Sequence, residues 1–79
     1  MHLDHDLTFS LALNYLKAGK KLSRSNWNGK GMWVELQRPD GNSKMTLPYL
    51  FISTVNGDLV PWVVSQTDLL AEDWFIVDD

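Results

Sequence analysis

The residues best suited to ligand chemistry lie in the segment 26–33, which reads NWNGKGMW. Within it, Asn28-Gly29 is a dipeptide typical of a hairpin turn, because both residues tolerate positive φ angles. Successive backbone N–H groups in such a turn can also form a nest that binds an anion, and Lys30 adds a positive charge there. The pattern favours a plain turn and leaves the anion site as the alternative.

A second polar segment, residues 65–68, reads SQTD. Ser65 and Asp68 have the spacing of a capping box, which predicts a short helical turn near the C-terminus. Gln66 and Asp68 also have the groups needed to bond ribose hydroxyls or the donor edge of a base. Helix capping is the simpler role, and it needs only one or two of these four side chains, which include Thr67.

The four tryptophans occupy two kinds of position. Trp33 and Trp74 lie inside strand patterns, which predicts that they pack in or on a sheet. Trp27 and Trp62 lie at the edges of predicted elements, beside polar residues. An aromatic ring at such an edge can stack on a base, which contributes about 1–3 kcal/mol per base. For Trp27 and Trp62, core packing and a ligand wall are equally supported.

The sequence offers little for catalysis or metal binding. It has no cysteine, and its two histidines, His2 and His5, lie close to the N-terminus, where chain ends are usually mobile. The adjacent carboxylates Glu72 and Asp73 would point apart on a helix, so they do not form an acid–base pair. We therefore predict a protein that is not an enzyme, with no catalytic residue, no metal site and no cofactor.

Length and charge restrict the class of protein. The chain has 79 residues, which predicts a single domain over residues 1–79, and so small a core favours self-association. Its net charge of −3 argues against binding nucleic acid polymers. Residues 17–38 nevertheless hold six Lys or Arg side chains and one Glu, which could meet a small anion or the acidic half of a neighbouring subunit. No apolar run approaches the roughly 20 residues of a membrane span, so no membrane contact is expected.

One long helix is predicted to precede these segments. The stretch 6–21 favours a helix, with Asp6 or Thr8 as the N-cap and Gly19 just beyond its end. The helix has two apolar stripes, which suggests that one faces the core and the other a second subunit. The stripes are Phe9, Ala12, Leu13 and Leu16, and Leu7, Leu11 and Tyr15.

Beyond the helix the hydrophobic period changes to two, which predicts strands. The predicted strands cover residues 32–37, 44–47, 49–55, 59–64 and 74–77, with turns at 39–41 and 56–58. Pro61 marks the fourth of them as an edge strand or a bulge. The predicted class is α+β: an N-terminal amphipathic helix packed on a small antiparallel β-sheet, with a short helical turn near the C-terminus.

Two stretches, GKKLSRSNWNGKGMW and NGDLVPWVVSQTDLLAEDW, together resemble a known family. The resemblance extends from the predicted helix to Trp74, which is nearly the whole chain. The family consists of small phage and prophage proteins, formerly a domain of unknown function and now called the second Thoeris anti-defence family. The resemblance implies a molecular sponge that binds glyco-cyclic ADP-ribose, the signalling nucleotide of the Thoeris defence, without cleaving it.

The resemblance also implies partners for this chain. Some members of the family bind cyclic dinucleotides as well, so these are a second expected ligand class. Members assemble as homotetramers with ligand pockets at subunit interfaces, and the same assembly is expected here. The expected place of action is the cytoplasm of the bacterial host cell.

The motif positions of the family suggest which residues form the site. We expect Trp27 or Trp62 to stack on a base and the turn at 65–68 to bond ribose or a base edge. Arg24 and Lys30 are the expected charges for phosphate. The candidate ligand-binding residues are Arg24, Trp27, Asn28, Lys30, Trp62, Ser65, Gln66, Thr67 and Asp68.

Two other functions stay open at this point. The protein could inhibit a host defence enzyme or effector by direct protein–protein contact, and a pull-down unaffected by nucleotide would support this. It could also be a hydrolase that destroys the signal, which predicts chemically altered nucleotide after incubation.

Overall fold

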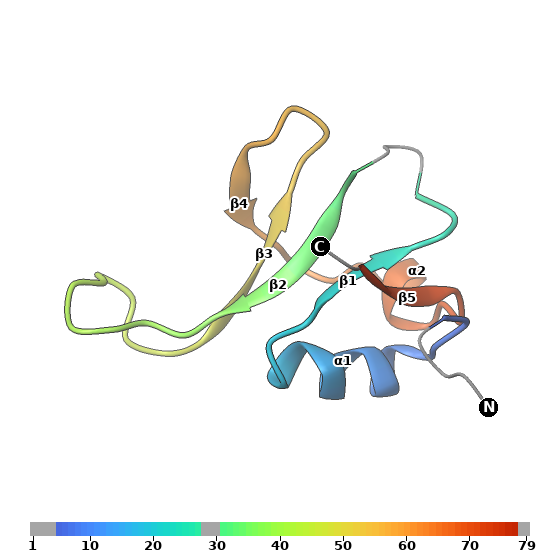
Figure 1. The fold of residues 1–79 in the computed structure, drawn as a ribbon, viewed down its shortest axis with the longest axis horizontal. Coiled ribbons are helices and arrows are strands. Elements are labelled where there is room, and N and C mark those ends of the chain that lie inside the picture. The colour runs from blue at the N-terminus through green and yellow to red at the C-terminus, as the bar shows by residue number, and fades with distance from the viewer. Residues whose placement is uncertain (1–4, 28–30, 78–79) are drawn as a thin grey trace.

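The computed structural model describes residues 5–27 and 31–77 of the chain, and that part contains two helices and five strands (Figure 1). In chain order these are α1 (Phe9–Lys17), β1 (Lys21–Arg24), β2 (Trp33–Gln37), β3 (Tyr49–Ser53), β4 (Leu59–Pro61), α2 (Gln66–Leu69) and β5 (Trp74–Val77). The strands form one antiparallel sheet in the order β4-β3-β2-β1-β5, which confirms the α+β class. Neither described helix is long and apolar enough to cross a membrane.

Helix α1 has caps that the sequence predicts, within a shorter span than 6–21. Thr8, rather than Asp6, is the N-cap, and its Oγ1 accepts a hydrogen bond from the backbone N–H of Leu11 at 3.3 Å. Gly19 adopts a φ of +94° just past the C-terminal end, a conformation that a residue without Cβ adopts freely. Both ends of the helix are therefore set by residues next to it in the chain.

The two apolar stripes of α1 have different surroundings. Three of the four residues in the first stripe are buried. In the second stripe Leu7 precedes the helix and is also buried, because its backbone pairs with that of Trp74. Leu11 is 46% exposed, so this part of the second stripe is open to another subunit.

The sheet differs from the sequence prediction at two places. The sequence does not predict β1, because KLSR has a single apolar residue and shows no alternation. The predicted strand at 44–47 is wrong: β2 pairs with β3 along its length, and residues 38–48 form the irregular connection between them. The other four predicted strands correspond to β2, β3, β4 and β5, and β4 with Pro61 lies at an edge of the sheet.

The core lies between α1 and one face of the sheet. Leu22, Val34 and Ile52 pair across three neighbouring strands, so they form a buried row on the face that α1 covers. Both helices lie on this side of the sheet (Figure 1). The opposite face carries Trp33 and Phe51, whose ring centroids are 5.9 Å apart, and neither described helix packs on it. The fold therefore has one covered and one aromatic, uncovered sheet face.

Candidate functional site

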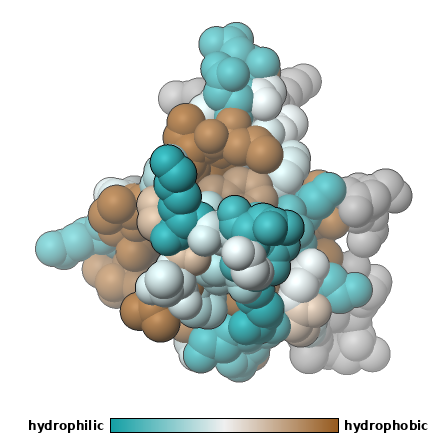
Figure 2. All heavy atoms as spheres, turned by 90° about the vertical axis from the view of Figure 1, so that its left-hand side faces the viewer, coloured by the Kyte–Doolittle hydropathy of each residue, from teal (hydrophilic) through white to brown (hydrophobic). Residues whose placement is uncertain are grey.

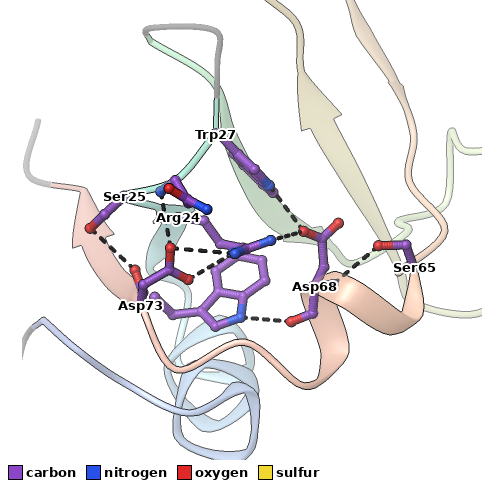
Figure 3. Close-up of polar contacts among 8 residues, drawn as sticks. Arg24, Ser25, Trp27, Ser65, Asp68 and Asp73 are labelled. Carbon is purple, nitrogen blue, oxygen red and sulfur yellow. Dashed lines mark hydrogen bonds and ion pairs between the residues drawn. The ribbon is translucent and has the colours of Figure 1, made fainter.

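An ion cluster joins the two polar segments that the sequence singles out (Figure 3). Arg24, at the end of β1, donates from Nη1 to Asp68 Oδ1 at 2.7 Å and from Nε to Asp73 Oδ1 at 2.7 Å. The three side chains are 10%, 15% and 27% exposed, so water screens these contacts only partly. This Arg24 cluster (Arg24, Asp68 and Asp73) ties β1 to α2 and to the residue that precedes β5.

Hydrogen bonds that involve backbone N–H groups hold the two aspartates in place. Ser65 is the N-cap of α2, and its Oγ accepts from the backbone N–H of Asp68 at 3.1 Å, as the predicted capping box requires. On the other side, Asp73 Oδ2 accepts from the backbone N–H of Asn26 at 3.0 Å. Two turns that are far apart in the sequence thus face each other across the guanidinium of Arg24.

Two tryptophans donate to the same residue of α2. Trp27 donates from Nε1 to Asp68 Oδ1 at 3.0 Å, and Trp74 donates from Nε1 to the carbonyl oxygen of Asp68 at 3.0 Å. The fully buried ring of Trp74 lies 5.4 Å from that of Trp27 and 6.0 Å from that of Trp62, between centroids. Trp27 and Trp62 therefore pack on the core through Trp74, while each remains half-buried with a surface toward solvent.

The Arg24 cluster holds both carboxylates in their charged form. Burial by itself would raise the pKa of Asp68, but hydrogen bonds from Arg24 and Trp27, with a smaller effect of the nearby Ser65 hydroxyl, outweigh burial and keep this pKa below its ordinary value. The hydrogen bond from Arg24 lowers the pKa of Asp73 against a smaller effect of burial. With one guanidinium and two carboxylates, the cluster carries a net charge of −1 at neutral pH.

The structure brings four of the nine candidate residues into direct contact: Arg24, Trp27, Ser65 and Asp68. Gln66 and Thr67 lie exposed on α2, next to this group. Trp62 is in contact with the ring of Trp27 at 6.4 Å between centroids, while Asn28 and Lys30 fall outside the described residues. The phosphate-binding role of Arg24 stays a prediction, and its guanidinium is engaged by two carboxylates of its own chain.

Sequence reasoning does not anticipate Asp73 and Trp74 in this group. Their place depends on the pairing of β5 with β1, which sets Trp74 opposite Arg24. No local pattern in the sequence reveals that pairing, because the sequence does not predict β1. An acid directly before the last strand was the only available signal, and it is a weak one.

Trp62 also lines a groove of about 400 Å³. The other walls are Pro61 and residues 45–50, and they are mainly apolar: Met45 and Leu47 are 56% and 75% exposed. Figure 2 looks onto the side that carries the 38–48 connection and shows hydrophobic patches there among hydrophilic side chains. The volume is within the range of about 300–1,000 Å³ typical of small-molecule sites. Trp62 thus borders both the aromatic cluster and a space large enough for a base.

The fold and the site define a small α+β domain in which partly exposed tryptophans flank an ion cluster and a groove. The described residues contain no group of three or more His, Cys, Asp or Glu side chains that could hold a metal ion. The groups that the site presents are therefore indole rings and hydrogen-bonding side chains.

Comparison with known proteins places this domain in a family. Residues 7–77 match the family described as Tad2-like, the Thoeris anti-defense 2-like domain. The protein named Thoeris anti-defense 2 from Bacillus phage SP01 is 38% identical over 84 residues, covering 90% of this chain and 94% of the phage protein. The chain belongs to the Thoeris anti-defense 2 family, as its two motifs predict, and this assigns it an anti-defence role. The family is named for that role and not for an enzymatic activity.

Proposed function

We propose that this protein is a molecular sponge that binds glyco-cyclic ADP-ribose in the host cytoplasm and holds it without cleaving it. The observation that carries the binding mechanism is the position of Trp62, which contacts the half-buried Trp27 and lines a groove of about 400 Å³. A base in this groove would contact an indole ring on one side and apolar side chains on the other. Cyclic dinucleotides, which also present planar bases, are the second proposed ligand class.

The affinity that a sponge needs indicates how much the rest of the site must contribute. Holding a scarce signal requires a Kd near 1 nM, which corresponds to about −12 kcal/mol. Stacking supplies about 1–3 kcal/mol per base, so polar contacts and a preformed site must supply the remainder. The Ser65 cap and the Arg24 cluster support this, because they fix α2 next to Trp27 and so reduce the cost of ordering the site.

Assembly as a homotetramer with pockets at subunit interfaces is part of the same proposal. The uncovered sheet face, with Trp33 and Phe51, and the exposed Leu11 on α1 supply apolar surface for contacts between copies. A domain of 79 residues without cysteine also has few other sources of stability. Size-exclusion chromatography with light scattering measures the assembly directly, and a monomer at micromolar concentration would contradict it.

Calorimetry with glyco-cyclic ADP-ribose and a panel of cyclic dinucleotides tests the binding. We expect tight binding by the wild type and recovery of intact nucleotide, identified by mass spectrometry, after heat denaturation. Trp62→Ala should weaken binding at least about tenfold, whereas the matched Trp62→Phe, which keeps an aromatic face, should retain most of the affinity. Thermal unfolding of both variants shows whether weaker binding comes from the loss of a ligand contact or from the loss of a core contact that stabilises the fold.

Three results would redirect the proposal. Absence of binding to every nucleotide in the panel would refute the sponge mechanism. Chemically altered nucleotide would indicate a hydrolase instead. Capture of a host enzyme or effector that added nucleotide does not release would favour inhibition by protein–protein contact, for which the exposed Val63 and Leu70 (88% and 75%) offer apolar surface.

A further inference from the structure

The two carboxylate oxygens of Asp68 have different surroundings. Oδ1 accepts from Arg24 Nη1 at 2.7 Å and from Trp27 Nε1 at 3.0 Å. Oδ2 accepts from none of the described residues, and Figure 3 shows it turned away from the guanidinium. The described part of the chain has no buried side-chain nitrogen or oxygen without a partner, so Oδ2 must reach solvent. This oxygen is an acceptor directed out of the cluster beside Trp27.

Each of the three nitrogens of the guanidinium that holds Asp68 donates to a carboxylate. Arg24 Nε and Nη2 donate to Asp73 at 2.7 and 3.4 Å, and Nη1 donates to Asp68. The charged groups facing Asp68 are therefore Arg24 from β1 and, across it, Asp73 from the segment before β5. Together with Asp68 these groups carry a net negative charge, which disfavours the approach of a phosphate group to this point. A hydrogen-bond donor, such as a sugar hydroxyl or a base amine, meets a favourable acceptor there.

We propose that Arg24 is a positioning residue of the nucleotide site: it holds Asp68 ionised, with Oδ2 directed outward to accept a hydrogen bond from a sugar hydroxyl or a base amine. The phosphates of the ligand then lie away from the Arg24 cluster. The proposal rests on the proposed nucleotide binding for the identity of the donor group. The state of Asp68 itself can be measured without any nucleotide.

The four indole N–H groups provide the probes for that measurement. Trp27 donates to the carboxylate of Asp68 and should sense its protonation, whereas Trp74 donates to the backbone carbonyl of the same residue and serves as an internal control. Two-dimensional ¹H–¹⁵N NMR spectra are recorded from pH 8 to pH 3. In the wild type, we expect the Trp27 signal to stay constant down to about pH 4, the ordinary pKa of an aspartate.

Arg24→Gln should make the Trp27 signal titrate at a higher pH. An adjacent opposite charge lowers an aspartate pKa by about 1–3 units, so its removal should raise the midpoint by a similar amount. Asp73→Asn is the matched control, because it removes the other carboxylate of the cluster while Arg24 still pairs with Asp68; its Trp27 signal should resemble the wild type. Should Arg24→Gln fail to fold, Arg24→Lys retains the charge with fewer donors and should give an intermediate midpoint.

Calorimetry adds the functional measurement, with glyco-cyclic ADP-ribose as the probe. The affinity of the wild type should be the same at pH 5 and pH 8, whereas that of Arg24→Gln should be at least about threefold lower at pH 5. A Trp27 signal in Arg24→Gln or Arg24→Lys that titrates as in the wild type would overturn the positioning role. Equal affinity of Arg24→Gln at both pH values, with the shifted NMR midpoint, would overturn the contact between Asp68 and ligand. Failure of the wild type to bind at all would refute the sponge and leave the NMR result standing.

Discussion

Replacing Arg24 with methionine tests whether the Arg24 cluster holds the fold together. Methionine keeps much of the volume of the side chain but leaves Asp68 and Asp73 without their cation. Removing one partner of a buried ion pair lowers the free energy of unfolding by about 3–5 kcal/mol. We take about 3 kcal/mol here, because Asp73 is 27% exposed. A domain of 79 residues has a free energy of unfolding of about 4–12 kcal/mol, so the variant should be near the limit of stability.

Thermal and urea unfolding measure this loss. For a domain of this size, 1 kcal/mol shifts Tm by about 4–8 °C, so Arg24→Met should unfold about 12–24 °C below the wild type at pH 7. All samples need the same protein concentration, because self-association makes Tm depend on concentration. The triple variant Arg24→Met, Asp68→Asn, Asp73→Asn removes the unpaired charges and should recover at least about half of the loss.

A loss below about 1 kcal/mol in Arg24→Met would refute this reasoning, because exposed ion pairs contribute no more than that. The cluster would then be a surface contact that water replaces easily. Failure of the triple variant to recover stability would point to the lost shape of the side chain, and not to uncompensated charge, as the cause.

Three further predictions concern pH, caps and a turn. Because the folded-state pKa values of Asp68 and Asp73 are lowered, their contribution to stability is present above about pH 4 and is lost as the pH falls further, which acid unfolding monitored by tryptophan fluorescence should show. Thr8→Ala and Ser65→Ala should each lower the free energy of unfolding by about 0.5–2 kcal/mol, and Thr8→Ser should retain most of it. Gly57→Ala should cost about 1 kcal/mol, because this residue has a φ of +87°, and no loss in urea unfolding would contradict the turn geometry.

The features that could be predicted from sequence depend on residues close together in the chain. Thr8 and Ser65 each accept from a backbone N–H three residues further along the chain, and Gly19 lies just beyond the end of α1. The hydrophobic period of two is equally local, and it locates β2 to within a residue. Sequence predicts such features because the residues that form them lie next to one another in the chain.

The features that could not be predicted depend on contacts between distant segments. Arg24 reaches Asp68 and Asp73 across 44 and 49 residues, and nothing in the local pattern specifies those pairs. The strand predicted at 44–47 fails for the same reason: β3, at Tyr49–Ser53, pairs with β2, and the competition between two candidate strands is decided by packing on the core. The sequence thus identifies the two motif segments but not the strand pairing that joins them.

Part of the positive charge of the segment 17–38 is used in contacts within the fold. Arg24 is neutralised within the chain, and Arg38 donates from Nη2 to the carbonyl oxygen of Lys17 at 2.7 Å, at the end of α1 where the helix dipole favours a cation. Arginine suits both places because its planar fork makes several directed hydrogen bonds at once. Both arginines of the segment therefore serve the fold. A nucleotide phosphate would then depend on lysines or backbone N–H groups outside the Arg24 cluster, so the net charge of a segment overstates what a ligand can reach.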